Sequence, residues 1–113
     1  MIKIYHNPRC SKSRQGLEIL TKSGKPFEII KYLDDNLSSE DLKRIINLLG
    51  IKPIDLVRKN EAIWKSDYKG KSLSDIQIID AMVKNPKLIK RPIVINGNKA
   101  VIGRPPELIL NIL

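Results

Sequence analysis

A strand, a helix and a second strand follow one another within the first third of the chain, and this order constrains the fold more than any other feature. Residues 2–5 alternate large apolar side chains with a lysine and predict a short strand, which an Asn-Pro pair ends. From Ser11 the pattern becomes helical and stops at Gly24, a residue suited to a helix C-terminus. Residues 27–33 predict a second strand. A crossover of about twenty residues implies parallel strands joined with a right-handed connection.

The middle of the chain predicts helices. Ser38, followed three residues later by Asp41, has the spacing of a capping box, with a helix running from there to Gly50. Residues 53–58 predict a short helix opened by a proline, and residues 60–66 predict a further turn.

A second capping box starts at Ser74, with Gln77 three residues on. The helix that follows is expected to stop before an Asn-Pro pair at 85–86. Its apolar residues predict one buried stripe: Ile76, Ile79, Met82 and Val83.

The C-terminal part predicts a hairpin and a last helix. Residues 93–96 and 99–102 have strand composition and flank a Gly-Asn pair, and Pro105-Pro106 supplies a proline for a helix through 108–112. The whole order is β-α-β, helices, β-β-α. We therefore expect an α/β protein with a thioredoxin-like fold and a mixed four-stranded sheet, formed by one domain over 1–113 with a helical insertion at about 38–86.

Cysteine and histidine content excludes two classes of site. One Cys and one His in 113 residues cannot form an internal disulfide or a Cys/His zinc site, so we expect no metal. No apolar run approaches the roughly 18 residues that a membrane span needs, and the N-terminus lacks a signal-peptide layout. We therefore expect a cytoplasmic protein that does not associate with membranes.

The net charge of +9 points to anionic partners or to a solvated basic surface. The lysines are scattered, the longest cationic run has two residues, and aromatic residues make up only 4%, too few for a base-stacking platform. We therefore do not expect a nucleic acid as partner.

The lone cysteine lies where a helix begins, in the stretch His-Asn-Pro-Arg-Cys-Ser-Lys-Ser-Arg at residues 6–14. Unpaired amide groups and the positive end of the helix dipole favour a thiolate at Cys10, and Arg9, Lys12 and Arg14 add positive charge. Such surroundings lower a thiol pKa from about 8.5 to roughly 3.5–7.5. The same helix N-terminus can hold an oxyanion, and Ser13 can donate a hydrogen bond to the thiolate or to the anion.

A structural interpretation of these residues stays open. A lone cysteine is most often a small buried apolar residue, although the polar neighbours of Cys10 favour a reactive thiol. His6 is either a hydrogen-bonded group at a strand end or a charge that tunes the thiolate.

The chain has few arginines, and most of them lie beside Cys10 or directly before a proline. The chain has fifteen lysines but six arginines, and arginine is the residue that binds oxyanions in a planar, bidentate way. Arg91 and Arg104 each precede a proline, which fixes the backbone, and Arg58 lies near the end of the short helix at 53–58. Arg44 is expected at the surface. Spacing alone leaves open whether the other arginines converge.

Separated motifs of this chain resemble, in the same order, those of the glutaredoxin-coupled arsenate reductases of the thioredoxin-like superfamily. They are Ile4-Tyr5-His6-Asn7-Pro8-x-Cys10-x-x-Ser13-Arg14, then Leu56-Val57-Arg58-Lys59-Asn60, then Asn85-Pro86-x-Leu88-Ile89-x-Arg91-Pro92-Ile93-Val94, and Arg104-Pro105. The resemblance runs from Ile4 to Leu113. Arg9 before the cysteine and Ser11-Lys12 after it are similar to a subgroup of uncharacterised homologues.

The resemblance implies an activity and a role for each matching residue. Cys10 would attack arsenate to form a thiol-arsenate adduct, glutathione would displace it as co-substrate, and glutaredoxin would regenerate the enzyme as arsenite leaves; no bound cofactor is expected. His6 and Ser13 would lower the pKa of the cysteine, and Pro92 would be the cis-proline that faces it. The oxyanion-binding residues would be Arg58, Arg91 and Arg104, together with Arg14.

Two other functions remain open at this point. Relatives with the same fold bind RNA polymerase as transcriptional regulators, and the redox-sensing ones carry a Cys-x-x-Cys motif where this chain has Cys10 and Ser13. A general monothiol protein that exchanges disulfides or removes glutathione needs only Cys10. Turnover with arsenate distinguishes the reductase from both.

Overall fold

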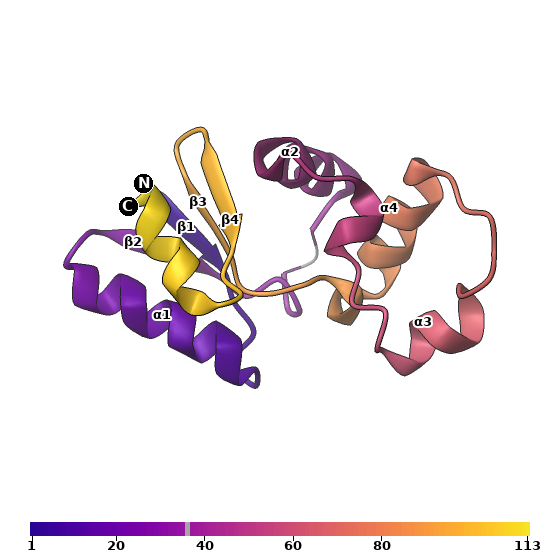
Figure 1. Cartoon of the computed structure of the whole chain (residues 1–113), viewed down its shortest axis with the longest axis horizontal. Coiled ribbons are helices and arrows are strands. Elements are labelled where there is room, and N and C mark those ends of the chain that lie inside the picture. Colours follow the sequence, from indigo (N-terminus) through magenta and orange to yellow (C-terminus); the bar gives the residue numbers. More distant parts are fainter. Residues whose placement is uncertain (36) are drawn as a thin grey trace. The chain divides into compact units, whose positions relative to one another are not determined.

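The computed structural model describes residues 1–35 and 37–113, which divide into two compact units (Figure 1). The sheet unit consists of Met1–Asp35 and Arg91–Leu113, and the helical unit consists of Asn36–Lys90. The helical unit covers the stretch where the sequence predicts the insertion.

Four short strands form the mixed sheet of the sheet unit. β1 (Ile2–Tyr5) pairs in parallel with β2 (Phe27–Ile30) and antiparallel with β3 (Ile93–Asn96), and β4 (Lys99–Ile102) pairs antiparallel with β3. The strand order β2-β1-β3-β4 confirms the predicted mixed, four-stranded α/β sheet. The ends of β1 and β2 lie at the same edge because these two strands run parallel.

The second strand ends three residues earlier than the sequence predicts. β2 stops at Ile30, whose register partner Tyr5 is the last residue of β1. The Lys31 carbonyl then accepts hydrogen bonds from the backbone N–H groups of Asp34 and Asp35, so the chain turns instead of extending. β2 ends early because β1, its partner strand, ends at Tyr5.

Two helical elements pack on the sheet around one apolar core. They are α1 (Ser11–Ser23), which ends at Gly24 with a φ of 73°, and the 3-10 helix η3 (Pro106–Ile112). The predicted C-terminal helix is therefore present but wound as 3-10. The apolar core of the sheet unit consists of Ile2, Ile4, Leu20, Val94 and Ile109.

In residues 37–90, the described part of the helical unit, there are three α-helices and two short 3-10 helices. They are α2 (Ser39–Leu49), η1 (Pro53–Leu56), α3 (Ala62–Asp67), α4 (Asp75–Lys84) and η2 (Pro86–Leu88). Both predicted capping boxes are confirmed, Ser38 with Asp41 at the start of α2 and Ser74 with Gln77 at the start of α4. Local sequence signals fix where these helices begin.

The predicted stripe of α4 is partly wrong. Ile76 is 64% exposed, whereas Ile78, Ile79, Ala81 and Met82 are buried. At 100° per residue, Ile76 lies about 140° from the centre of that buried face. The stripe through Ile79 and Met82 therefore continues to Ile78 rather than to Ile76.

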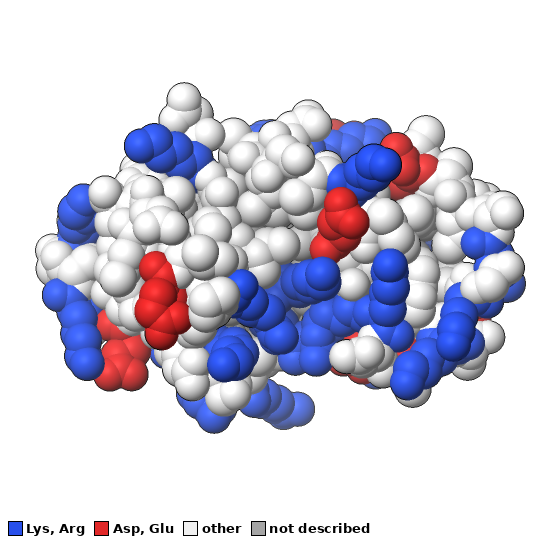
Figure 2. Space-filling view, viewed as in Figure 1, with Lys and Arg blue, Asp and Glu red and all other residues white. Residues whose placement is uncertain are grey.

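No helix in the described part of the chain is long and apolar enough to cross a membrane. The same residues contain no group of three or more His, Cys, Asp or Glu side chains that could hold a metal ion. Figure 2 shows Lys and Arg side chains spread over elements of both units on the face in view, with fewer acidic side chains among them.

Candidate active site

Cys10 occupies the N-cap position of α1. Its backbone is extended (φ −96°, ψ 124°), its N–H donates to the carbonyl of Asn7 at 3.0 Å, and its carbonyl accepts from the N–H of Arg14 at 3.0 Å. The N–H groups of the first helical turn have no carbonyl before them in the helix, so they form the positive end of its dipole at the sulfur. This arrangement favours an anion, either the thiolate itself or a bound oxyanion.

The loop before Cys10 is tied to the first turn of the helix through one hydroxyl group. Ser13 Oγ accepts a hydrogen bond from the backbone N–H of Asn7 at 2.9 Å and shares a hydrogen bond of 2.7 Å with Nδ1 of His6. All three residues are buried. Ser13 therefore holds the loop through its hydroxyl group, and its influence on Cys10 comes from its backbone N–H.

Further hydrogen bonds stiffen the same loop. Asn7 Oδ1 accepts from the backbone N–H of Arg9 at 3.0 Å, and the guanidinium of Arg14 donates to the carbonyl of Pro8 at 3.0 Å. Arg14 is exposed, and its guanidinium holds the loop backbone. A role for Arg14 at the oxyanion stays a prediction.

His6 is held in its neutral form. Burial lowers the pKa of His6 most, the positive charges of Lys31 and Arg14 lower it further, and an interaction with the backbone of Ser13 acts in the opposite direction. A neutral ring at physiological pH supplies a hydrogen bond to the loop rather than a positive charge to the thiolate.

The surroundings of Cys10 favour its thiolate. Burial on its own raises the pKa of the thiol, but the backbone N–H of Ser13, the hydrogen bond and charge of Arg91 and the backbone N–H of Lys12 together outweigh it, so the pKa lies below the usual value. The Cys10 side chain is half-buried, so reagents can reach it.

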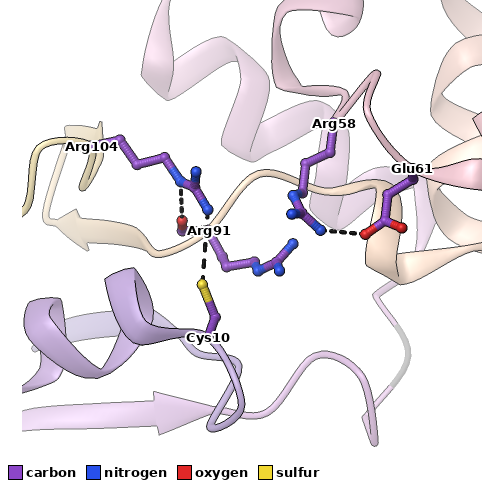
Figure 3. A network of polar contacts seen from close by, with 5 residues as sticks. All are labelled: Cys10, Arg58, Glu61, Arg91 and Arg104. Carbon is purple, nitrogen blue, oxygen red and sulfur yellow. Dashed lines mark hydrogen bonds and ion pairs between the residues drawn. The ribbon is translucent and has the colours of Figure 1, made fainter.

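Two arginines that precede prolines act on Cys10, and Figure 3 shows the contact of Arg104 with the sulfur. Arg104 donates from Nη2 to Cys10 Sγ at 3.8 Å and from Nε to the carbonyl of Arg91 at 2.8 Å. Arg91 is buried, 9% exposed, and its Nε and Nη1 have no hydrogen-bond acceptor among the residues that the structure describes. Buried guanidinium donors without an acceptor are costly unless an anion binds them.

Pro92 fixes the position of Arg91 against α1. The Arg91–Pro92 peptide bond is cis, as predicted for Pro92, and Arg104–Pro105 is cis as well, which was not predicted. A side chain at Gly16 would place its Cβ 2.9 Å from Pro92 Cγ, and one at Gly103 would come equally close. Gly16 therefore lets Pro92 lie directly on the helix that carries Cys10, and Gly103 lets the segment after β4 approach Pro92 from another element.

Arg58 belongs to the helical unit. Its backbone N–H donates to the carbonyl of Leu88 at 2.7 Å, next to the isolated bridge between Val57 and Ile89, and its guanidinium forms an ion pair with Glu61. Glu61 was missed in the sequence, although its spacing of three residues from Arg58 is a usual one for ion pairs. A role for Arg58 at the oxyanion stays a prediction.

Asn7, which was not predicted as a site residue, also holds the Cys10 loop. It is 8% exposed and uses both its side chain and its backbone to hold the loop. The signal was its position before a proline, where asparagine commonly organises a turn.

Comparisons with known proteins match nearly the whole chain. Residues 5–112 match the ArsC family. An arsenate reductase of Haemophilus influenzae is 43% identical, with 97% of each chain covered, and the uncharacterised protein YfgD of Escherichia coli is 44% identical, over 99% of this chain and 96% of that protein. The solved structure of an arsenate reductase from Vibrio cholerae superposes with a TM-score of 0.95 at 45% identity, covering 99% of this chain and 97% of that one.

Proposed function

Because the chain belongs to the ArsC family, we propose that it is an oxidoreductase that reduces arsenate to arsenite through Cys10, with glutathione as co-substrate and glutaredoxin as the protein that regenerates it. The fold is the thioredoxin-like fold of the arsenate reductases. In this proposal no cofactor is bound, because thiols supply both electrons, and the reaction takes place in the cytoplasm, where thiols are kept reduced.

One observation carries the proposal: a thiol with a lowered pKa lies beside a buried arginine whose Nε and Nη1 find no acceptor in the described part of the chain. A tetrahedral oxyanion bound there would accept from Arg91 and from the free N–H groups at the start of α1. It would also lie next to the sulfur that must attack it. Nucleophile and anion site then coincide, which displacement at arsenic requires.

The first step forms a bond between Cys10 sulfur and arsenic. The thiolate attacks arsenic(V), and one arsenate oxygen leaves as water after protonation. Arg91 and Arg104 offset the negative charge of the oxyanion and of the adduct. Arg104 also contacts the sulfur directly, so it is suited to follow the charge as it moves from sulfur to the oxyanion.

The second step transfers the electrons. A glutathione thiolate attacks the Cys10 sulfur, the electron pair of the sulfur–arsenic bond stays on arsenic, and arsenic(V) becomes arsenic(III). The products are arsenite and a mixed disulfide between Cys10 and glutathione, which glutaredoxin then reduces. An external thiol is required because the chain has one cysteine.

Arsenate-dependent NADPH oxidation tests the proposal, with glutathione, glutathione reductase and glutaredoxin supplied. Wild type is expected to turn over arsenate, and Cys10→Ser is expected to lose turnover completely. Ser11→Ala is the matched control, since Ser11 is exposed and adjacent in sequence.

Absence of turnover in wild type, with Cys10 still reacting as a low-pKa thiol, would contradict arsenate reduction. Reactivity toward protein or glutathione disulfides would then favour a general monothiol protein. Binding to RNA polymerase without any turnover would favour a transcriptional regulator.

A further inference from the structure

We propose that a cavity of about 340 Å³ beside the Cys10 loop is the site that binds glutathione, with Arg9 and Lys31 on its two carboxylates and Asp34 on its ammonium group. The choice of ligand rests on the proposed function, since it names where that co-substrate binds. The cavity lies within the sheet unit and is lined by His6, Asn7, Pro8, Arg9, Lys31, Leu33 and Asp34.

The cavity lies next to Cys10 along the chain. Residues 7–9 line it, and they lead directly into Cys10, so Arg9 is the nearest chain neighbour of the nucleophile. Consecutive Cα atoms are about 3.8 Å apart, so the lining reaches to within one residue of Cys10. Its volume lies at the lower end of the range of about 300–1,000 Å³ for small-molecule sites, which suits a tripeptide.

The charges of the cavity equal those of glutathione in number and are opposite to them in sign. At neutral pH glutathione carries two carboxylates and one ammonium group, and the cavity presents two cations, Arg9 and Lys31, and one carboxylate, Asp34. Among the described residues, none of these three side chains takes part in an ion pair. They are therefore available to a ligand, and a bidentate contact of Arg9 with a carboxylate is the stronger of the two cationic contacts.

The inner wall of the cavity is rigid and polar. His6 and Asn7 are buried and are held by their hydrogen bonds to Ser13, the residue that also presents its N–H to Cys10. The exposed side chain of Leu33 adds an apolar contact at the outer wall. A tripeptide bound here would therefore lie against a preorganised surface, which reduces the entropic cost of binding.

A disulfide-exchange reaction tests this site without arsenate. When Cys10 thiolate attacks glutathione disulfide, a Cys10–glutathione disulfide forms, the original disulfide bond breaks, and one glutathione thiolate leaves. Cys10 is oxidised and the departing glutathione is reduced. The neutral 2-hydroxyethyl disulfide reacts with the same sulfur but carries no charge for the cavity to bind.

The experiment measures the rates of Cys10 with both disulfides in wild type, Arg9→Ser, Lys31→Gln and Asp34→Asn. We expect the Arg9 and Lys31 variants to react about tenfold more slowly with glutathione disulfide, and within twofold of wild type with the neutral disulfide. Asp34→Asn is expected to slow only the reaction with glutathione disulfide. Lys25→Gln, an equal charge loss at an exposed position of the same unit, is expected to match wild type with both.

Two results would overturn the assignment. One is an unchanged ratio of the two rates in the Arg9 and Lys31 variants, whether both rates fall together or neither changes. The other is an equal fall in that ratio for Lys25→Gln, because it would indicate net charge rather than the cavity. The assay contains no arsenate, so its outcome is separate from that of the arsenate turnover assay.

Discussion

At the scale of single residues, the reactivity of Cys10 depends on which of several opposing effects is larger. Burial raises the pKa of its thiol, and two backbone N–H groups together with Arg91 lower it by more. Arg104 adds a direct contact with the sulfur. His6 is linked to the first turn of α1 by one hydrogen bond, with Ser13 Oγ, and is neutral, so it acts on the geometry of the loop.

Replacing Arg91 with alanine should raise the pKa of Cys10 and weaken arsenate binding. The change removes a hydrogen bond and a positive charge from the thiolate, and a hydrogen bond to a charged group contributes about 1.5–3 kcal/mol. We expect kcat/KM for arsenate to fall roughly 10- to 150-fold. The pH profile of the alkylation rate measures the pKa.

Arg44→Ala is the control for this change, because Arg44 is an exposed arginine of α2 whose ion pair with Asp41 is long. It should leave both the alkylation profile and kcat/KM as in wild type. An alkylation midpoint that does not move in Arg91→Ala would contradict the role assigned to this arginine.

The lowered pKa of Cys10 also predicts how stability depends on pH. The unfolded chain holds the thiol proton up to a higher pH than the folded chain, so the free energy of unfolding rises with pH between the two pKa values. This contribution is fully present above the unfolded pKa and is lost as pH falls through the folded pKa. Urea unfolding of wild type and Cys10→Ser should therefore show a difference that grows in favour of wild type toward alkaline pH; a difference independent of pH would contradict it.

At the scale of elements, the site depends on two loops that are both held against α1. The stretch from His6 to Arg9 is tied to α1 by the Ser13 hydroxyl, and the Arg91 loop lies on the same helix through Pro92 and Gly16. The helix thus positions nucleophile and oxyanion donors together. Changes within these contacts should alter stability and activity together.

Ser13→Ala should destabilise the sheet unit and loosen the Cys10 loop. It leaves the buried N–H of Asn7 without an acceptor, which costs about 1–3 kcal/mol. Urea unfolding measures the loss. Ser11→Ala, at an exposed position of the same turn, should change the free energy of unfolding by less than about 0.5 kcal/mol. Equal effects of the two substitutions would show that the Ser13 hydroxyl does not hold the loop.

Gly16→Ala should destabilise the protein although alanine normally favours a helix. The new Cβ would lie 2.9 Å from Pro92 Cγ and 3.0 Å from Ile109 Cδ1, so the Arg91 loop must shift. We expect a loss of about 1–3 kcal/mol in the free energy of unfolding and a lower rate of arsenate turnover. Gln15→Ala, exposed one residue earlier, should be neutral. A more stable Gly16→Ala variant would contradict the packing described here.

At the scale of the whole molecule, local signals explain which parts were predictable. The crossover from β1 to β2, both capping boxes and the 97–98 hairpin turn follow from short sequence patterns, and all are confirmed. The end of β2 and the exposure of Ile76 were predicted wrongly, because each depends on a neighbouring element rather than on its own sequence.

The residues of the candidate site were predictable from the sequence, but their hydrogen-bond partners were not. The charged neighbours of Cys10 and the two arginines before prolines were visible in the sequence, whereas the use of the Ser13 hydroxyl for His6 and Asn7 was not. Hydrogen bonds between residues six or seven positions apart depend on how the loop folds, and no short pattern encodes them. The glycines opposite Pro92 were likewise invisible, since their role arises from contact across the fold.

The central claim is that the Cys10 sulfur bonds first to arsenic and then to glutathione within one catalytic cycle. Intact-mass spectrometry without glutaredoxin tests this claim most directly. The account predicts that the protein gains one glutathione only when arsenate and reduced glutathione are both present, and that Cys10→Ser gains none. Omitting arsenate, or replacing it with phosphate, should abolish the adduct. An adduct that forms equally without arsenate, or no adduct under any of these conditions, would contradict the account.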